Sequence, residues 1–201
     1  EARADALGAA QSIAGEERRL VEVAIDLLTA ISASPDVHAF GTDSCNDVFE
    51  RLLEESDGYA NMGIADSSGF LRCSGLPFNP PVDVSDRRWF QGALETGRPS
   101  IGRFQIGRVT GRATINVGVP VRVATGATIG VAFAAVDLME LGEASLRGLD
   151  LLPGTVITVF DPDRIVLFRS DDDLLAVGDV MPDSEVVDDV VRLGTGTFER
   201  V

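Results

Sequence analysis

The sequence predicts an α+β fold, with a long N-terminal helix followed by two modules that each carry an antiparallel sheet. Residues 2–33 show a wide apolar stripe at helical spacing and contain no Pro. From Tyr59 the apolar pattern changes to that of strands. After "LLPG" the strand pattern begins again on a smaller scale and stops in mid-strand. We therefore expect an N-terminal helix at 1–35, a first module at 36–148 and a small, truncated second module at 149–201.

Two helices are predicted before the first strand. The first ends near Pro35, and its apolar stripe is formed by Leu20, Ala24, Leu27, Leu28 and Ile31. The next segment, "DSCNDVFERLLEES", opens with Ser44 as the expected N-cap and has an acid three residues later. Its apolar residues recur at i, i+3, i+4, i+7 and i+8, which places Cys45 on the buried face of a second helix.

The first module contains five predicted strands. "YANMGIAD" and "FLRCSG", joined by "SSG", form a hairpin with Cys73 on its second strand. An extended linker, "LPFNPP", leads to the short helix "DVSDRRWFQGALETG", which we expect Ser85 or Asp86 to cap and Gly97 to end. Three strands and a helix follow, in "PSIGRFQIGRV", "RATINVGVPVRV", "ATIGVAFAAVD" and "DLMELGEASLRGLD". Five antiparallel strands with a helix between the second and the third form a PAS-like arrangement.

The second module has the pattern of a shorter copy of the same topology. "TVITVF" and "RIVLFRS" flank the turn "DPDR", the segment "DSEVVDDVVRLG" is a helix, and "TGTFERV" begins another strand. The acidic stretches "DPDR" and 171–173 are interpreted as ordinary Asp-rich turns rather than as calcium loops.

Composition excludes several classes of function. The net charge of −15 argues against nucleic-acid binding, because phosphate would be repelled over most of the surface. Two cysteines and one histidine, His38, cannot complete a tetrahedral zinc site, so we expect no metal and no cofactor. The chain also lacks a G-x-S-x-G motif and a carboxylate pair at catalytic spacing, so we expect no enzyme activity. Because the chain begins without Met, we expect it to be a fragment of a longer protein.

Positive charge gathers in one short stretch of this acidic chain. From Arg87 to Arg122 there are seven arginines against one glutamate, a local excess of +6. A planar guanidinium can grip a carboxylate through two parallel hydrogen bonds. Thr114, Asn116 and Gly118 alternate with apolar residues and give one strand a small, polar face, which suits either a pocket floor or a solvent-exposed surface. The pattern favours a carboxylate site, while any single arginine can equally be a solvated position or a partner for an acid.

The stretch "DVSDRRWFQGALETGRPSIGRFQIGRVTGRATINVGVPV", followed by "GVAFAAVDLMEL", resembles the double Cache (PDC-type) extracellular sensor domain. Such domains occur in bacterial histidine kinases, diguanylate cyclases and chemoreceptors. The resemblance implies a membrane-distal PAS-like module with a small-molecule pocket. It also implies a periplasmic or extracellular location, within a parent chain that is anchored in the cell membrane. Ligand binding would shift helix packing and so signal to a cytoplasmic output, a histidine kinase in our first interpretation and a diguanylate cyclase in our second.

The same resemblance implies the site residues. In amino-acid-binding members an Arg-x-Trp-aromatic motif grips the ligand carboxylate, and Arg87, Trp89 and Phe90 match that spacing. Asp137 matches the Asp that takes the ligand ammonium. The chain departs from the family at Val82, where a Tyr is expected, and lacks the usual Tyr-x-Asp after the pocket helix. The candidate ligand-binding residues are Arg87, Trp89, Phe90, Phe104, Arg108, Asn116 and Asp137.

Some alternatives remain open at this point. The residues alone allow Cys45 and Cys73 to be two buried free thiols or one disulfide, and the resemblance implies the disulfide. The expected partner is a small carboxylate or amino-acid-like ligand, with a homodimer through the N-terminal helix as a further expectation. The alternative functions are a ligand-free module for dimerisation or relay, or the sensor domain of a diguanylate cyclase or chemoreceptor.

Overall fold

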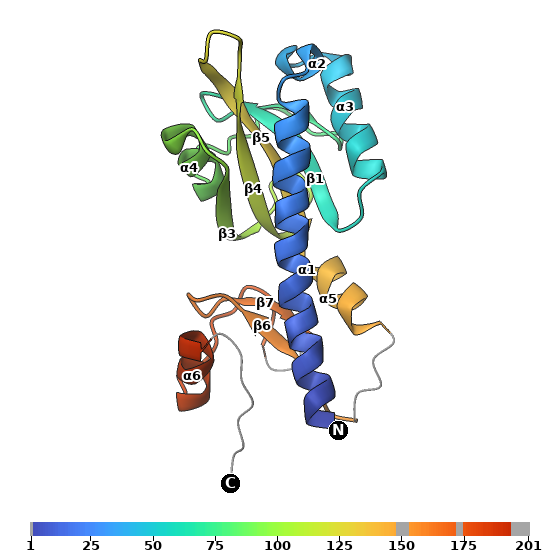
Figure 1. Ribbon diagram of the computed structural model, residues 1–201, viewed down its shortest axis with the longest axis vertical. Helices are drawn as coiled ribbons and strands as arrows, with labels where there is room; N and C mark the ends of the chain where they lie inside the picture. Colours follow the sequence, from blue (N-terminus) through green and yellow to red (C-terminus); the bar gives the residue numbers. More distant parts are fainter. Residues whose placement is uncertain (1, 148–152, 172–174, 194–201) are drawn as a thin grey trace. The chain divides into compact units, whose positions relative to one another are not determined.

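The computed structural model describes residues 2–147, 153–171 and 175–193 (Figure 1). The chain divides into two compact units. The sheet unit is Arg19–Asp137, and the small unit combines Glu1–Arg18 with Leu138–Val201. The strand expected at 195–201 lies outside the described residues.

Three helices precede the first strand. α1 spans Ala2–Ile31, α2 spans Pro35–His38 and α3 spans Asp43–Glu54. The prediction of Ser44 as the N-cap of α3 is wrong, since the cap is Thr42. Thr42 has extended backbone angles, and its hydroxyl accepts a hydrogen bond from the Cys45 N–H. Ser44 lies inside the first turn, where its backbone is already helical. Among the described residues, no helix is both long enough and apolar enough to cross a membrane.

A five-stranded antiparallel sheet forms the centre of the sheet unit, in the order β2-β1-β5-β4-β3. The strands are β1 (Tyr59–Asp66), β2 (Leu71–Ser74), β3 (Ser100–Ile106), β4 (Ala113–Arg122) and β5 (Thr128–Asp137). This confirms the predicted α+β fold, with a hairpin, a helix and three further strands in that order.

The helix between β2 and β3 is α4, Arg88–Thr96. It ends at Gly97, as predicted, with a positive φ of 64° that suits glycine. The predicted caps, Ser85 and Asp86, are wrong: the N-cap position is Arg87, and it makes no side-chain capping bond. The Asp86 carboxylate is bound by Arg108 instead, so it is not available to the helix.

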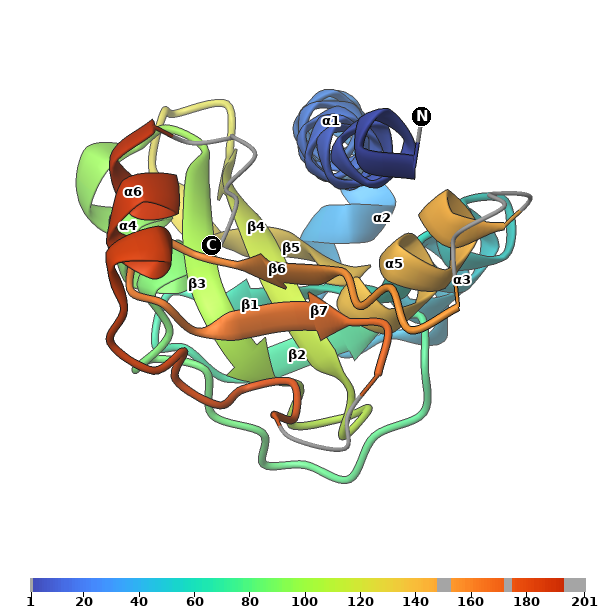
Figure 2. The ribbon, with the colours of Figure 1, turned by 90° about the horizontal axis from the view of Figure 1, so that it is seen from below.

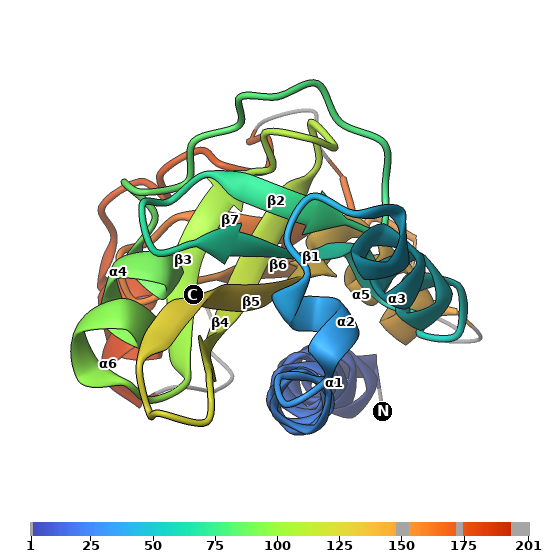
Figure 3. The same ribbon diagram turned by 90° about the horizontal axis from the view of Figure 1, so that it is seen from above.

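Helices lie on both sides of the sheet. α3 contacts β1 and β2, whereas α4 contacts β3, β4 and β5, and Figure 3 shows the sheet between α4 and α3. Successive side chains of a strand point to opposite faces. On β4, therefore, Asn116 lies on one face and Ile115 and Val117 lie on the other, and all three are buried. A Cβ atom at Gly118, on the face of Asn116, would lie 2.8 Å from the Trp89 ring of α4. The polar side of β4 thus faces α4.

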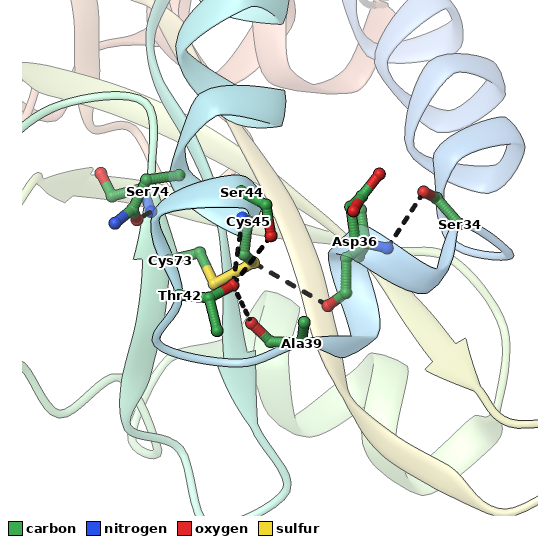
Figure 4. The surroundings of a disulfide bond; sticks show 10 residues. Ser34, Asp36, Ala39, Thr42, Ser44, Cys45, Cys73 and Ser74 are labelled. Atoms are coloured by element: carbon green, nitrogen blue, oxygen red, sulfur yellow. Dashed lines mark hydrogen bonds between the residues drawn. A yellow bond between two sulfur atoms is a disulfide. The ribbon is translucent and has the colours of Figure 1, made fainter.

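A disulfide joins α3 to the hairpin. Cys45 and Cys73 are both fully buried, their Cα atoms are 5.8 Å apart, and their sulfur atoms are bonded (Figure 4). Beside it, the Ser74 N–H donates to the Asn46 side chain at 3.0 Å. The structure therefore confirms the disulfide that the family resemblance implied.

The small unit has a sheet of two strands. β6 (Thr158–Phe160) and β7 (Val166–Arg169) are antiparallel and lie side by side in Figure 2. α5 (Leu138–Leu146) contacts β7, and α6 (Glu185–Leu193) follows. The ring of Phe168 lies against Gly142 and occupies the position of any side chain there. Close helix–strand packing of this kind needs a glycine.

Candidate functional site

The sheet unit contains a small cavity bounded by α4, the sheet and the loop that joins β3 to β4. Its volume is about 40 Å³. Because a bound water needs ~10–15 Å³, about three waters would fit. The apolar lining residues are Leu71, Val82, Val84, Trp89, Val109, Phe133 and Ala135. The other lining residues are Asn61, Arg87, Gln105, Gly107, Arg108, Thr110 and Asn116.

Four of the seven predicted ligand-binding residues line this cavity, namely Arg87, Trp89, Arg108 and Asn116. The other three, Phe90, Phe104 and Asp137, are placed elsewhere. Phe90 is 3% exposed and belongs to the apolar cluster beside α4. Its ring meets the Trp89 ring edge-on, with ring centres 6.0 Å apart, and so supports that residue from behind.

Phe104 does not line the cavity, because an irregularity in β3 turns its side chain to the other face of the sheet. The register with β4 shifts between Ile101 and Phe104. Such a bulge reverses the faces of the residues that follow. Gly102 lies against Trp89, but after the bulge Gln105, and not Phe104, lines the cavity.

Asp137 is occupied by another charge. Its carboxylate is fully buried and forms an ion pair with Arg112, with Nη1 and Oδ2 2.7 Å apart. The end of β5 therefore carries a neutralised pair where a bare acid was predicted to take a ligand ammonium.

Trp89 forms one wall of the cavity and is 1% exposed. Its ring is tilted against that of Phe133, with ring centres 5.1 Å apart. Within the described ranges, its buried indole N–H has no hydrogen-bond partner. A buried donor without a partner costs about 1–3 kcal/mol, so Trp89 carries an unsatisfied donor in a residue that lines the cavity.

Arg87 supplies positive charge to the cavity. Its side chain is 20% exposed, it donates to the Ile106 carbonyl at 3.2 Å, and its Nε lies 3.8 Å from an Asp86 oxygen. Burial, followed by the positive charge of Arg108, lowers the pKa of the Arg87 guanidinium. Both causes disfavour the charged guanidinium. An anion bound beside it would therefore stabilise the charged form of Arg87.

Arg108 is held by a carboxylate. Its two terminal nitrogens bind the two Asp86 oxygens at 2.7 Å each, and Nη1 also donates to the Asp83 carbonyl. The hydrogen bonds with Arg108 lower the pKa of Asp86, and those with Asp86 raise the pKa of Arg108. This clamp, formed by Asp83, Asp86 and Arg108, ties the β3–β4 loop to the segment before α4.

The clamp predicts an acid-dependent loss of stability. Because the folded pKa of Asp86 lies below its usual value, the stabilisation is complete above about pH 4 and is lost as the pH falls through the folded pKa. We expect the free energy of unfolding to fall between about pH 5 and about pH 2 less steeply in Asp86→Asn than in wild type. Urea unfolding at the two pH values measures the difference, with Asp57→Asn, at an exposed turn position, as the control that should follow wild type. Equal falls in all three proteins would contradict the clamp.

Sequence reasoning missed three polar residues of the cavity, Asn61, Gln105 and Thr110. Asn61 is 3% exposed, exchanges hydrogen bonds with the Ser74 hydroxyl, and accepts the Met62 N–H at 2.9 Å. An Asn inside the apolar strand "YANMGIAD" was a usable signal. Gln105 had none, because its position depends on the bulge.

The comparisons concern the fold. No family model and no curated protein matches the chain, but solved structures do. The sensor domain of the V. cholerae histidine kinase DctB is 16% identical with a TM-score of 0.69, over 91% of this chain and 72% of that one. The sensory domain of the Campylobacter jejuni chemoreceptor Tlp3, with isoleucine bound, is 17% identical with a TM-score of 0.66, over 92% and 76%.

A third solved structure has the same fold. The ligand-binding domain of the Pseudomonas aeruginosa PAO1 amino-acid chemoreceptor PctC, in complex with GABA, is 19% identical with a TM-score of 0.59, over 84% of this chain and 76% of that one. At these identities the likeness shows the fold alone. The chain has the fold of the sensor domains of histidine kinases and chemoreceptors.

Proposed function

We propose that this chain is an extracytoplasmic sensor domain of the double Cache type, which binds a small carboxylate-bearing ligand and signals to a histidine kinase-type output. The membrane-distal module is 36–148, the membrane-proximal one is 149–201, and the parent chain is anchored in the membrane. The chain has no chemistry of its own. The observation that carries the proposal is that Arg87 and Trp89 line the same cavity. Arg87 contributes a guanidinium, and the Trp89 indole N–H has no hydrogen-bond partner among the described residues.

The fold and the cavity support this proposal together. The structures of similar fold hold isoleucine and GABA, and both ligands carry a carboxylate. In this chain the arginines predicted to receive a carboxylate differ in their state. Arg108 is already paired to Asp86 through two hydrogen bonds, whereas the nearest Arg87 nitrogen to that carboxylate is 3.8 Å away. Arg87 is therefore the anchor.

A path from the cavity to the N-terminal helix exists within the sheet unit. Asn61 of β1 lines the cavity. Two residues earlier on the same strand, the Tyr59 hydroxyl donates to the Leu20 carbonyl of α1 at 2.6 Å, and Tyr59 is 6% exposed. A ligand that moves β1 would move this hydrogen bond, and α1 is the helix that would carry the signal toward the membrane.

The test compares two adjacent arginines at the start of α4, Arg87 at the N-cap position and Arg88 in the first turn. In wild type, a carboxylate at 100 times its dissociation constant should add about 2.7 kcal/mol to the free energy of unfolding. Acetate, propionate, pyruvate, L-alanine, GABA and succinate form the panel for thermal shift. We expect Arg87→Met to lose the shift and Arg88→Met, at an exposed position that does not line the cavity, to keep it. A shift that survives Arg87→Met would contradict the assignment of the site.

The small volume of the cavity favours a second candidate, a ligand-free module for dimerisation or relay. If the chain has that function, none of the carboxylates should stabilise the wild-type chain. A panel without any shift, together with a dimer in analytical ultracentrifugation, would support the relay and contradict the sensor.

A further inference from the structure

We infer that the cavity selects short monocarboxylates that lack an amino group. This inference rests on the proposed function and narrows its ligand class. It is carried by the chemistry of the lining residues, by the pairing of the neighbouring acids, and by the size of the cavity.

No acidic side chain lines the cavity in the part of the chain that the structure describes. Of the acids on the elements around it, Asp86 is held by Arg108 and Asp137 by Arg112. A ligand ammonium has three donors and no acceptor. It would meet the positive charge of Arg87 without a counter-charge, and so an α-amino acid is disfavoured relative to the same acid without its amino group.

Three lining residues offer hydrogen-bond donors. Arg87 has its guanidinium, and Trp89 has its buried N–H. Asn116 is 4% exposed, and its side-chain oxygen accepts a hydrogen bond from the Thr114 hydroxyl at 2.8 Å, which leaves its amide nitrogen as the donor for a ligand. A carboxylate accepts hydrogen bonds through both oxygens. The donor set therefore matches a head group that only accepts.

The volume of the cavity and the charge of Arg108 limit the part of the ligand beyond its carboxylate. Space for about three waters corresponds to ~90 Å³ of liquid, which is the scale of a carboxylate with two or three carbons. The walls beside it are apolar, from Leu71, Val84 and Phe133, and suit a methyl or ethyl group. A second carboxylate would need a second cation, but the charge of Arg108 is already balanced by Asp86.

Four small molecules of similar shape test this inference by isothermal titration calorimetry on the 201-residue chain. Propionate carries the expected groups. L-alanine adds an amino group, succinate adds a second carboxylate, and propionamide removes the charge. We expect propionate to bind at least tenfold more tightly than each of the others. Preference for L-alanine or succinate would overturn the inference and leave the proposed function intact, whereas failure of every carboxylate to bind would contradict both.

Two variants examine the donors. Trp89→Phe keeps an aromatic ring but removes the N–H, and we expect it to weaken propionate at least fivefold. Asn116→Asp replaces a donor by an acid in nearly the same shape, so it should weaken propionate and raise the affinity for L-alanine relative to propionate. Circular dichroism and unliganded melting curves establish that each variant folds. Unchanged propionate affinity in both folded variants would overturn the donor assignment.

Discussion

Replacing both Cys45 and Cys73 with serine is expected to lower the free energy of unfolding by about 3.5 kcal/mol. The disulfide closes a loop with a sequence separation of 28, and the unfolded chain gains that loop's freedom when the bond is removed. Both residues are fully buried. The link also holds α3 on the hairpin that contributes Asn61 and Leu71 to the cavity.

Urea unfolding of the oxidised wild type, the reduced wild type and the double serine variant measures this effect. The reduced protein and the variant should agree within about 1 kcal/mol, since both lack the cross-link. A double alanine variant separates the cost of burying two hydroxyls from the cost of losing the bond. Stability that is unchanged by reduction would show that the bond contributes nothing to the fold.

Trp89→Ala is expected to destabilise the chain by about 3–5 kcal/mol, as is typical for a large aromatic residue in a core. The ring is 1% exposed and contacts Phe133. Gly102 and Gly118 leave no room for a side chain beneath it, since a Cβ atom would lie 3.1 Å and 2.8 Å from the ring. Because these glycines cannot fill the space, the cavity left by the indole stays open.

Phe104→Ala is the matched control for this effect. Phe104 lies on β3, is only half-buried and does not line the cavity, so its truncation should cost less than half as much. Urea unfolding of both variants gives the comparison. Equal costs would mean that α4 is not packed on the sheet through Trp89.

The elements of the fold could be predicted because each has a local signal. Alternation along β4 and the turn "SSG" after β1 indicated strands, and Gly97 marked the end of α4. The caps could not be predicted in the same way. Ser44 and Asp86 are both good capping residues, but Thr42 lies two positions earlier with suitable backbone angles, and Asp86 is bound by an arginine 22 residues further along the chain.

The candidate site was predictable to the extent that it depends on α4 and on one face of β4. Arg87 and Trp89 were predicted from the family resemblance and Asn116 from the alternation along its strand, and the structure places all three on one cavity. The pairings that assign roles to the other arginines are long-range. The sequence gathers the positive charge, but only the folded chain shows that Asp86 neutralises Arg108 and that Arg112 covers Asp137. Phe104 was predicted from the family resemblance, but Gln105 lines the cavity instead, because β3 has a bulge that the sequence does not reveal.

A crystal structure of the chain grown with propionate tests the central claim most directly. The account predicts density for the carboxylate inside the cavity, with its oxygens within about 2.7–3.2 Å of the Arg87 guanidinium and the Trp89 indole nitrogen. Propionate bound elsewhere, or an empty cavity with the Arg87 side chain turned into solvent at saturating propionate, would contradict it.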